Sequence, residues 1–415
     1  MRTLVLGVST RAAVESAVRG GHEVVAVDFF GDRDQAGLAE SYALRRDLGL
    51  PATAEGLEAA AGRLRADAVV YGSSLENHPE VVARLAGRRR VLGNSAEALR
   101  EVRDWAVLRR FCREAGIAHP VTLLRGEERG AGRGRWLRKR VRSGGGHGIA
   151  PWDGSALDDA HVLQAVVEGA PASVAFVADG ARSRVFAVTE QLLGIAALGA
   201  SGFSWCGNIL PPEVDGGVAG GASLYGELDA MAAALTRRFG LVGVNGLDVV
   251  IGRDAEGAPR AYLIEVNPRF SGSMELAEWS SGVNVFSLHL DSFAGRLPET
   301  AVAAPAGRDT LGKAIVYARR ALVVPDADDW PGSAARDLPW PGERIERGHP
   351  VCTVVARGRD RRDCFGGLLA AAGEVYGDND EWKEGSREPA SHPDHRSHAQ
   401  AGDRHAQGQE LARVP

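Results

Sequence analysis

Cysteine, lysine and long apolar runs are scarce in this chain of 415 residues, and the lack of cysteine pairs and of apolar runs each argues against a class of protein. The 4 cysteines lie far apart with no Cys-x-x-Cys pair, which argues against a disulfide framework and against a zinc site. No apolar run approaches the ~18 residues of a membrane helix, and no charged leader precedes the first apolar segment. We therefore expect a cytoplasmic protein without a membrane span or an export signal.

An excess of positive charge is also missing. The net charge at pH 7 is -5 and the isoelectric point is about 6.2, so we expect neither nucleic acid nor an acidic membrane as a partner. Lysine occurs only at Lys139, Lys313 and Lys383, so a lysine here is informative. With 44% hydrophobic residues the chain can form two or three domains, and its oligomeric state stays open, a homo-oligomer included.

Strand and helix patterns alternate over residues 1–95. An apolar run at Thr3–Val8 is followed by a helix-like Arg11–Arg19 and a second apolar run that ends on Asp28, which is a βαβ opening. This pattern predicts a doubly wound, Rossmann-like α/β domain. The first turn holds only Gly7, without the Gly-x-Gly-x-x-Gly of dinucleotide sites, which argues against nicotinamide or flavin binding.

Polar residues follow several of these predicted strands, at the sheet edge where parallel sheets bind ligands. They are Arg11, Asp28, Asp32, Ser73, Glu76 and Asn77. Together they predict a substrate pocket. Ordinary helix capping and solvated turns explain each of them singly, so this alternative stays open.

A cationic strand runs into a glycine-rich loop within Trp136–Ile149. The loop contains Ser143, Gly144, Gly145, Gly146 and Gly148. Backbone N–H groups of such a loop can curl around phosphate oxygens, and Lys139 on the strand can point at the same phosphates. A flexible hairpin with a basic flank is the alternative.

Two neighbouring predicted strands joined by a turn carry oxygen-bearing side chains. Asp248 lies on the first strand, and Glu265 and Asn267 share one face of the second because strand side chains alternate. Carboxylate and amide oxygens suit a hard cation such as Mg2+. Arg269 follows directly, where its planar guanidinium can hold a phosphate. The alternative is a buried strand whose glutamate simply pairs with the arginine.

These motifs, in this order, resemble the ATP-grasp superfamily over roughly residues 1–370. The matching segments are Lys139 with Ser143–Gly148, Gln164–Gly169, Asn245–Asp248 and Glu265–Arg269. The resemblance implies an α/β and α+β architecture: an ATP-grasp fold with an N-terminal doubly wound domain and a small C-terminal capping module. We expect the Rossmann-like domain at 1–95, two ATP-grasp subdomains at 96–300, the capping module at 301–376 and a disordered tail at 377–415.

The resemblance also implies ATP and Mg2+ (or Mn2+) as cofactors, with Lys139 and Arg269 acting on the transferred phosphoryl group. The implied nucleotide contacts are Lys139, Ser143, Gly144, Gly145, Gly146, Gly148, Gln164, Val166, Val167 and Glu168, and the implied metal ligands are Asp248, Glu265 and Asn267. Two positions depart from the family pattern. Arg103-Asp104-Trp105 replaces a segment in which many members carry a lysine. In the segment Gln164–Gly169, which corresponds to the hinge of the family, Ala165 replaces an acidic residue.

The function that the resemblance implies is a ligase that activates a carboxylate as an acylphosphate and joins it to an amine. More narrowly, the chain is similar to a carboxylate-amine ligase branch related to biotin carboxylase. Some members of that branch occur beside genes for methanofuran or methanopterin coenzymes, which suggests an amino acid such as glutamate as a substrate. The partners would be small-molecule carboxylates and amines. A biotin-dependent carboxylase subunit and a non-catalytic ATP-binding protein are the alternatives.

The C-terminal part contains one misleading motif. Gly307–Ala314 has the spacing of a Walker A loop, but Ala314 replaces the Mg2+-binding hydroxyl and a strand-like segment follows, so we discount it. Lys313 is expected to begin a strand, with a carboxylate-binding role left open. Pro325–Arg347 reads as an irregular crossover. The tail beyond Asp378 has little to bury, and its histidines do not predict a metal site.

Overall fold

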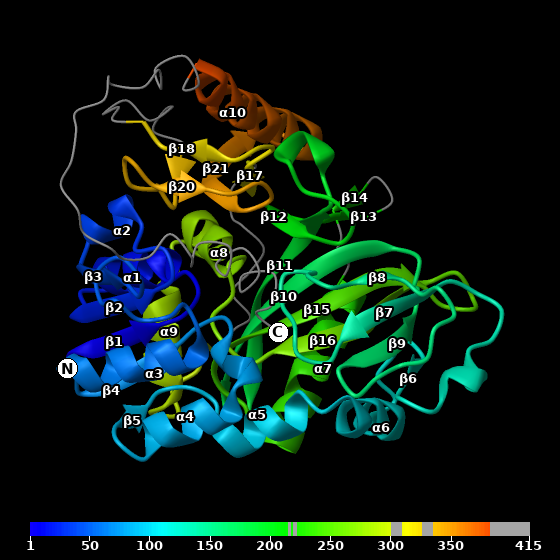
Figure 1. Cartoon of the computed structure of the whole chain (residues 1–415). Coiled ribbons are helices and arrows are strands. Elements are labelled where there is room, and N and C mark those ends of the chain that lie inside the picture. Colours follow the sequence, from blue (N-terminus) through cyan, green and yellow to red (C-terminus); the bar gives the residue numbers. More distant parts are fainter. Residues whose placement is uncertain (215–216, 219–221, 300–308, 326–334, 382–415) are drawn as a thin grey trace, which may run out of the picture.

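The computed structural model describes residues 1–214, 217–218, 222–299, 309–325 and 335–381. Figure 1 shows three larger sheets side by side, with a five-stranded, an eight-stranded and a four-stranded order. Two short ribbons complete the strands: β13 (Glu213–Val214) with β14 (Gly217–Val218), and β18 (Leu322–Val323) with β20 (Arg344–Ile345). None of the helices in the described ranges is long and apolar enough to cross a bilayer.

The N-terminal sheet is parallel, with the strand order β3-β2-β1-β4-β5. Its strands are β1 (Thr3–Leu6), β2 (Val24–Asp28), β3 (Glu40–Ala43), β4 (Ala68–Tyr71) and β5 (Arg90–Val91). Its helices are α1 (Arg11–Arg19), α2 (Arg33–Ala36), α3 (Ala54–Arg63), η1 (Leu75–Asn77) and α4 (Pro79–Ala86). This order confirms the predicted doubly wound domain.

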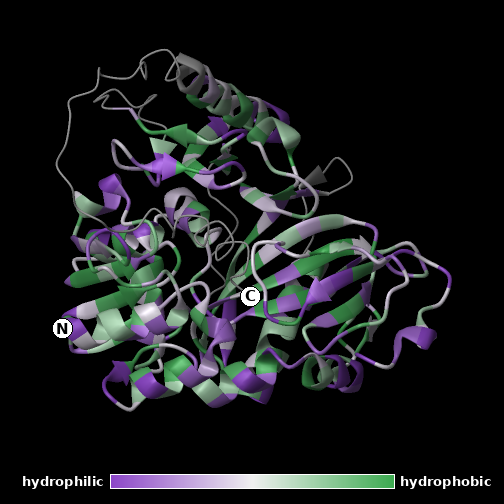
Figure 2. Cartoon of the chain, viewed as in Figure 1, coloured by the Kyte–Doolittle hydropathy of each residue, from purple (hydrophilic) through white to green (hydrophobic). Residues whose placement is uncertain are grey.

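The central N-terminal strands consist largely of hydrophobic residues, which Figure 2 colours green. Leu4 and Leu6 pack into one core cluster, whereas Val5 packs into another on the opposite face. A strand buried on both sides needs a continuous apolar run, because successive side chains alternate between the faces. This requirement explains why the run was readable in the sequence.

The four-stranded sheet has the order β6-β9-β7-β8. Its elements are β6 (Thr122–Leu123), η2 (Glu128–Gly130), β7 (Trp136–Arg140), β8 (Ala150–Pro151) and β9 (His161–Ala165), reached through α5 (Ala96–Val102) and α6 (Trp105–Ala115). The side chain of Asp104 caps α6 by accepting hydrogen bonds from the N–H groups of Ala106 (2.8 Å) and Val107 (3.1 Å). This cap separates α5 from α6, in agreement with the interrupted periodicity of the sequence.

The eight-stranded sheet has the order β16-β15-β10-β11-β12-β17-β21-β19. Its strands are β10 (Ala170–Asp179), β11 (Ser183–Leu193), β12 (Trp205–Leu210), β15 (Val242–Arg253), β16 (Pro259–Asn267), β17 (Thr310–Tyr317), β19 (Ala335–Arg336) and β21 (Pro350–Gly358). The other elements are η3 (Ala196–Leu198), α7 (Ala222–Phe239), α8 (Met274–Ser281), α9 (Val285–Ser292) and α10 (Arg361–Glu381). Helix α7 packs in one core cluster of this sheet and α9 in the other.

These elements show how the C-terminal part is organised. The chain after β16 forms two helices, because Gly282 adopts a φ of 75° and ends α8. Strand β17 pairs with β12 and with β21, so these C-terminal strands continue the large sheet, whereas β18 and β20 pair only with each other among the described strands. Helix α10 runs to Glu381, so residues 377–381 are helical, and the rest of the predicted disordered tail lies outside the described residues. The domain boundaries themselves stay a prediction.

The Walker-like segment is strand from Thr310 onward, which agrees with discounting it. Its first residues, 307–308, lie outside the described ranges.

One stability prediction follows from His289 on α9. The side chain is 3% exposed, accepts a hydrogen bond from Val244 N–H at 3.0 Å through Nδ1, and donates through Nε2 to the carbonyl oxygen of Leu92 at 3.0 Å. Burial lowers its pKa to about 4. Because the unfolded imidazole gains a proton near pH 6.5 and the folded one does not, the free energy of unfolding should fall between about pH 6.5 and 4, by roughly 1.4 kcal/mol per pH unit.

Urea unfolding at pH 7 and pH 5 measures this dependence. His289→Asn keeps an acceptor for Val244 but cannot titrate, so its stability should change less over this range. An equal pH dependence in the variant would assign the effect to other groups.

Candidate active site

Two antiparallel strands bring the predicted acidic residues together. Strands β15 and β16 pair with Asp248 opposite Glu265 and Gly246 opposite Asn267, so the predicted pairing is confirmed. The Asn267 amide nitrogen donates to Asp248 Oδ2 at 2.9 Å. Three oxygen-bearing side chains therefore share one face of the sheet.

The electrostatics of this pair fit a divalent cation. Burial and the adjacent Glu265 raise the pKa of Asp248 to about 7. Burial also opposes the charge on Glu265, but Arg103 and Lys139 hold the pKa of that carboxyl below its usual value. The two carboxyls thus compete for one proton, and a hard cation such as Mg2+ or Mn2+ satisfies both oxygens in its place.

Two further side chains fix Asp248, and no sequence pattern pointed to either. Its Oδ1 accepts hydrogen bonds from the Gln191 amide at 2.8 Å and from the Ser173 hydroxyl at 3.2 Å. Ser173 lies directly opposite Asp248 on β10, and Gln191 comes from β11. Ser173 and Gln191 reach Asp248 only because of the order of the strands in the sheet. The spacing of residues along the sequence does not encode that order.

Lys139 joins the same site from β7. The side chain is 7% exposed, and its Nζ donates to Gln164 Oε1 on β9 at 2.6 Å. Burial lowers the lysine pKa, while the charges of Glu265 and Asp248 oppose that shift. Gln164 is itself held by Thr122, to which its amide donates at 3.2 Å. The predicted phosphate-binding lysine therefore stands in the field of the predicted metal ligands.

The glycine loop lies against the segment that leads into β12. The Trp205 N–H donates to the Gly145 carbonyl at 2.9 Å. Gly146 adopts a φ of 77°, and a Cβ there would lie 1.8 Å from the carbonyl oxygen of Phe203. Gly148 also has a positive φ and packs on the side chain of Arg140. The loop therefore adopts a backbone conformation that requires glycine.

Arg103 is the main site residue that sequence reasoning left without a role. Its guanidinium donates to Glu265 Oε2 at 3.4 Å, to Asn77 Oδ1 at 2.9 Å and to the Ser143 carbonyl oxygen at 3.0 Å. The remaining donor, Nε, is buried and has no partner among the described residues. The departure from the family lysine was visible in the sequence, and the structure shows that the replacing arginine reaches the site.

Arg269 lies where its position after β16 predicted. Its Nε donates to Glu76 Oε1 at 2.7 Å, and its Nη2 donates to Asn267 Oδ1 at 3.4 Å. The side chain is 11% exposed. Glu76 comes from the N-terminal domain, so this ion pair joins that domain to the end of β16, which carries two of the predicted metal ligands.

Comparison with known proteins relates part of the chain to a described domain family. Residues 103–273 match a family model described as an ATP-grasp domain. The chain contains an ATP-grasp domain. Over 247 residues it is 24% identical to the carbamoyl phosphate synthase large chain of Thermoplasma acidophilum, a match that covers 54% of this chain and 22% of that protein. The match thus spans about a fifth of that relative's length.

Solved structures confirm the ATP-grasp fold over most of the chain. Biotin carboxylase from Campylobacter jejuni is similar with a TM-score of 0.65 at 14% identity, covering 88% of this chain and 89% of that one. N5-carboxyaminoimidazole ribonucleotide synthetase from Thermus thermophilus has a TM-score of 0.61 at 17% identity, covering 90% and 98%. The predicted fold class, α/β and α+β, is confirmed.

The hinge of the ATP-grasp domain lies beside the end of β15. A Cβ on Gly252 would lie 2.7 Å from the Glu168 carbonyl oxygen and 3.4 Å from the side chain of Val167. The Val166 N–H donates to the Arg135 carbonyl at 2.9 Å, and the exposed Glu168 carboxylate pairs with the Arg135 guanidinium. The nucleotide contacts of these residues stay a prediction.

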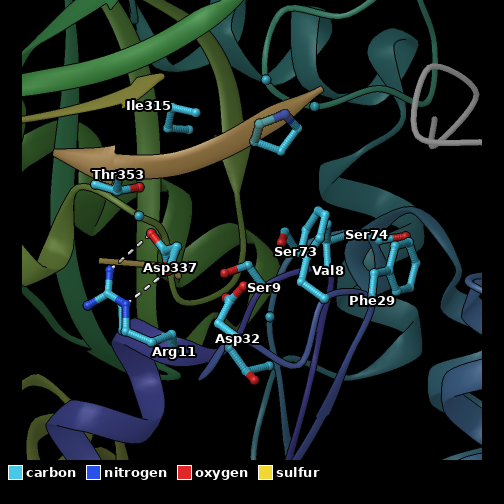
Figure 3. A pocket seen from close by; sticks show the side chains of 18 of the residues that line it. Val8, Ser9, Arg11, Phe29, Asp32, Ser73, Ser74, Ile315, Asp337 and Thr353 are labelled. Carbon is cyan, nitrogen blue, oxygen red and sulfur yellow. Dashed lines mark hydrogen bonds and ion pairs between the residues drawn. The ribbon is translucent and has the colours of Figure 1, made fainter. Parts of the chain in front are cut away.

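A cavity of about 610 Å³ adjoins the ATP-grasp residues. It lies between the N-terminal domain, the glycine loop and the C-terminal strands, as Figure 3 shows for part of its wall. The predicted pocket residues Arg11, Asp32, Ser73, Glu76 and Asn77 all line it.

Asp28 was wrongly placed in this pocket. It is fully buried beneath the wall, where its carboxylate accepts hydrogen bonds from the N–H and hydroxyl of Thr10 at 3.0 and 2.7 Å and from Gly31 N–H at 2.6 Å. Its role is to hold the loops after β1 and β2.

Lys313 lies in a buried charge network at the same wall. It forms an ion pair with Glu275, which also binds Arg11 at 2.7 Å, and Arg11 in turn binds Asp337 at 2.9 Å. The network joins α1, α8, β17 and the residue after β19. Because each cation has an acidic partner, the carboxylate-binding role left open for Lys313 gains no support here.

A glycine substitution tests the seated loop. Gly146→Ala would clash with Phe203 and impose backbone strain of about 1–3 kcal/mol, so we expect kcat/KM for ATP to fall on the order of 10-fold. Gly132→Ala is the matched control, since a Cβ there meets no atom within 4 Å. ATP-dependent turnover of both variants measures the difference, and equal values would contradict the need for this loop conformation.

Proposed function

We propose that this chain is an ATP- and Mg2+-dependent ligase that activates a carboxylate as an acylphosphate and joins it to an amine. The observation that supports it most is the convergence of three cations, Lys139, Arg103 and Arg269, on the Asp248–Glu265 pair. Of these residues, Arg269 also lines the substrate-sized cavity. The comparisons support the ATP-grasp fold, and the reaction is what we propose in addition.

The charges suit phosphoryl transfer. In this reaction negative charge spreads over the equatorial oxygens of the moving group, and catalysis is mainly positioning plus electrostatic stabilisation. Mg2+, held by Asp248, Glu265 and Asn267, would neutralise part of that charge. In the proposal Lys139 holds phosphate oxygens of ATP, and Arg269 steadies the transferred group on the cavity side, where Glu76 fixes its guanidinium.

Arg103 has a second task in this proposal. Its unpartnered Nε is a buried donor that suits a phosphate oxygen, and its other nitrogens fasten the Ser143 carbonyl and Asn77. An acylphosphate hydrolyses in water, so the reaction needs a loop that excludes solvent. The glycine loop, held by Arg103 on one side and Trp205 on the other, serves that purpose.

The finer substrate assignment rests on the ligase branch that the motifs resemble. We propose an amino acid such as glutamate as a substrate, and one-carbon coenzyme (methanofuran or methanopterin) synthesis as the pathway. We also propose a cytoplasmic location and only small-molecule partners.

A biotin-dependent carboxylase subunit is the second candidate, because biotin carboxylase is similar over 88% of this chain. A non-catalytic ATP-binding protein would share the nucleotide contacts but release no ADP. The reaction products separate these three functions.

An ADP-release screen tests the proposal. The purified full chain is incubated with ATP and Mg2+, with amino acids and coenzyme precursors supplied singly and in carboxylate-plus-amine pairs. The proposal predicts ADP formation that requires both members of a pair. Turnover that needs bicarbonate and biotin would favour the carboxylase, and nucleotide binding without ADP under every condition would favour the non-catalytic protein.

A further inference from the structure

The Asp32 carboxylate lines the cavity with one oxygen that lacks a hydrogen-bond partner within the part of the chain that the structure describes. The residue is 5% exposed, and its Oδ2 is buried without a hydrogen-bond partner among the described residues. Asp32 stands at the N-cap of α2, yet its side chain accepts no capping hydrogen bond. An unmatched buried carboxylate oxygen is costly, so the site is incomplete without a donor.

The neighbouring acids Asp28 and Asp34 accept hydrogen bonds, unlike Asp32 Oδ2 among the described residues. Asp28 accepts hydrogen bonds from Thr10, as described above. Asp34 accepts from Leu338 N–H at 2.9 Å and from Asp337 N–H at 3.0 Å. Burial, together with the charges of Asp337, Asp28 and Asp34, raises the pKa of Asp32 well above its usual value, although Arg11 opposes the shift. The wall around Asp32 therefore favours an incoming positive charge.

A second acceptor on the same wall is also unmatched. Glu76 Oε1 accepts from Arg269, but Glu76 Oε2 is buried and has no partner among the described residues. The buried cations that line the cavity are already paired, because Arg11, Lys313 and Arg269 each bind an acidic side chain. The N-terminal wall thus presents spare acceptors, which complement a molecule that carries hydrogen-bond donors.

Apolar side chains also line the cavity, alongside polar ones such as Ser9 and Ser73 next to Asp32. Val8, Phe29 and Phe30 line the cavity from the N-terminal domain, and Ile315 and Tyr317 line it from β17. Figure 3 draws Val8, Phe29 and Asp32 on one side of the cavity and Ile315 on the other. Side chains of this kind surround a flat or compact hydrocarbon group and leave its polar end to the carboxylate.

We propose that the cavity takes a primary amine with an apolar, ring-sized body, whose ammonium group binds Asp32. This inference rests on the ligase function proposed above and names the class of its amine substrate and the residue that recognises it. For the reaction the ammonium group passes one proton to the Asp32 carboxylate, and the neutral amine then forms the C–N bond as the C–O bond to the phosphate leaving group breaks. Binding satisfies the open oxygen of Asp32 and offsets the negative charge that Asp28, Asp34 and Asp337 concentrate there. Glu76 supplies the second acceptor, beside Arg269 and the phosphoryl site.

Binding of benzylamine and benzyl alcohol to the full chain, measured by calorimetry without ATP, tests this inference. The two probes share a ring, but only the amine is cationic. We expect benzylamine to bind at least about 10-fold more tightly, since a charge-assisted hydrogen bond is worth roughly one decade or more. If the unmodified protein bound both probes equally, or did not bind benzylamine, the proposal would be overturned.

Asp32→Asn keeps the shape of the side chain and removes its charge. It should lower benzylamine affinity about 10-fold, to the level of the alcohol, and leave benzyl alcohol binding unchanged. The control is Glu58→Gln, which removes a buried acid that pairs with Arg84 away from the cavity, and which should bind both probes as the unmodified protein does. Unchanged benzylamine affinity in Asp32→Asn would place the amine elsewhere.

These binding measurements need no turnover, so they separate this inference from the ligase proposal. A chain that binds benzylamine through Asp32 but forms no ADP with any substrate pair would retain the amine site and lose the ligase function. A chain that forms ADP but does not distinguish the two probes would retain the function and lose this site.

Discussion

Glu265→Gln should lower the rate of ADP formation by about 100-fold or more, because it removes the carboxylate that would share the proposed metal position with Asp248. Glutamine has nearly the same shape, so the β15–β16 pairing should persist. Arg103 and Lys139, whose charges now hold the pKa of Glu265 low, would face each other without that anion. The Mg2+ concentration needed for half-maximal turnover should also rise.

The matched control for this variant is Glu190→Gln. Glu190 lies on β11 of the same sheet and pairs with Arg361 of α10 at 2.5 Å, away from the metal ligands. It should retain turnover and Mg2+ dependence. If Glu265→Gln also kept both, the paired carboxylates would not be the metal site.

Arg269→Met should produce a loss of similar or greater size. Groups that stabilise charge on a transferred phosphoryl are worth about 10²- to 10³-fold or more in rate. Arg269 is well placed for this because Glu76 and Asn267 hold its guanidinium from two sides. The loss should fall mainly on kcat, with a smaller change in KM for ATP, because Lys139 still holds the nucleotide.

Lysine should not rescue this position. A compact ammonium cannot reach Glu76 and Asn267 with the planar fork that arginine provides, so Arg269→Lys should stay close to Arg269→Met. Arg182→Met, which removes an exposed arginine paired with Asp179, is the control. Separate kcat and KM values for the three variants decide the matter, and near-normal activity of the lysine variant would mean that only charge is needed there.

The sequence predicted best those features that local pattern determines. Strand β1 needed a continuous apolar run, and the alternation of Glu265 and Asn267 fixed a shared face before their neighbours were known. The glycines at 145, 146 and 148 were readable because their positive φ values demand that residue type. Such signals lie within a few residues of one another.

The features that escaped prediction depend on contacts between distant segments. Gln191 reaches Asp248 only through the order of β15, β10 and β11, and Arg103 reaches Glu265 across 162 positions in the chain. Asp28 was misread because a polar residue after a parallel strand can face the cavity or support the loops beneath it. Only the hydrogen bonds from Thr10 distinguish these two cases.

The apposed carboxyls also explain how the site is held together before a cation binds. Burial and the charge of Glu265 raise the pKa of Asp248 to about 7, and Asn267, Gln191 and Ser173 donate hydrogen bonds to its carboxyl group. The oxygens are therefore already oriented, so little rearrangement opposes metal binding. In our proposal, metal and nucleotide share this position.

Equilibrium binding of Mn2+, followed by electron paramagnetic resonance with and without a non-hydrolysable ATP analogue, tests that claim most directly. The account predicts that the unmodified chain immobilises Mn2+ together with the nucleotide, and that Glu265→Gln loses most of this bound signal. Full immobilisation of Mn2+ by Glu265→Gln would contradict it and place the metal, and the reaction, elsewhere.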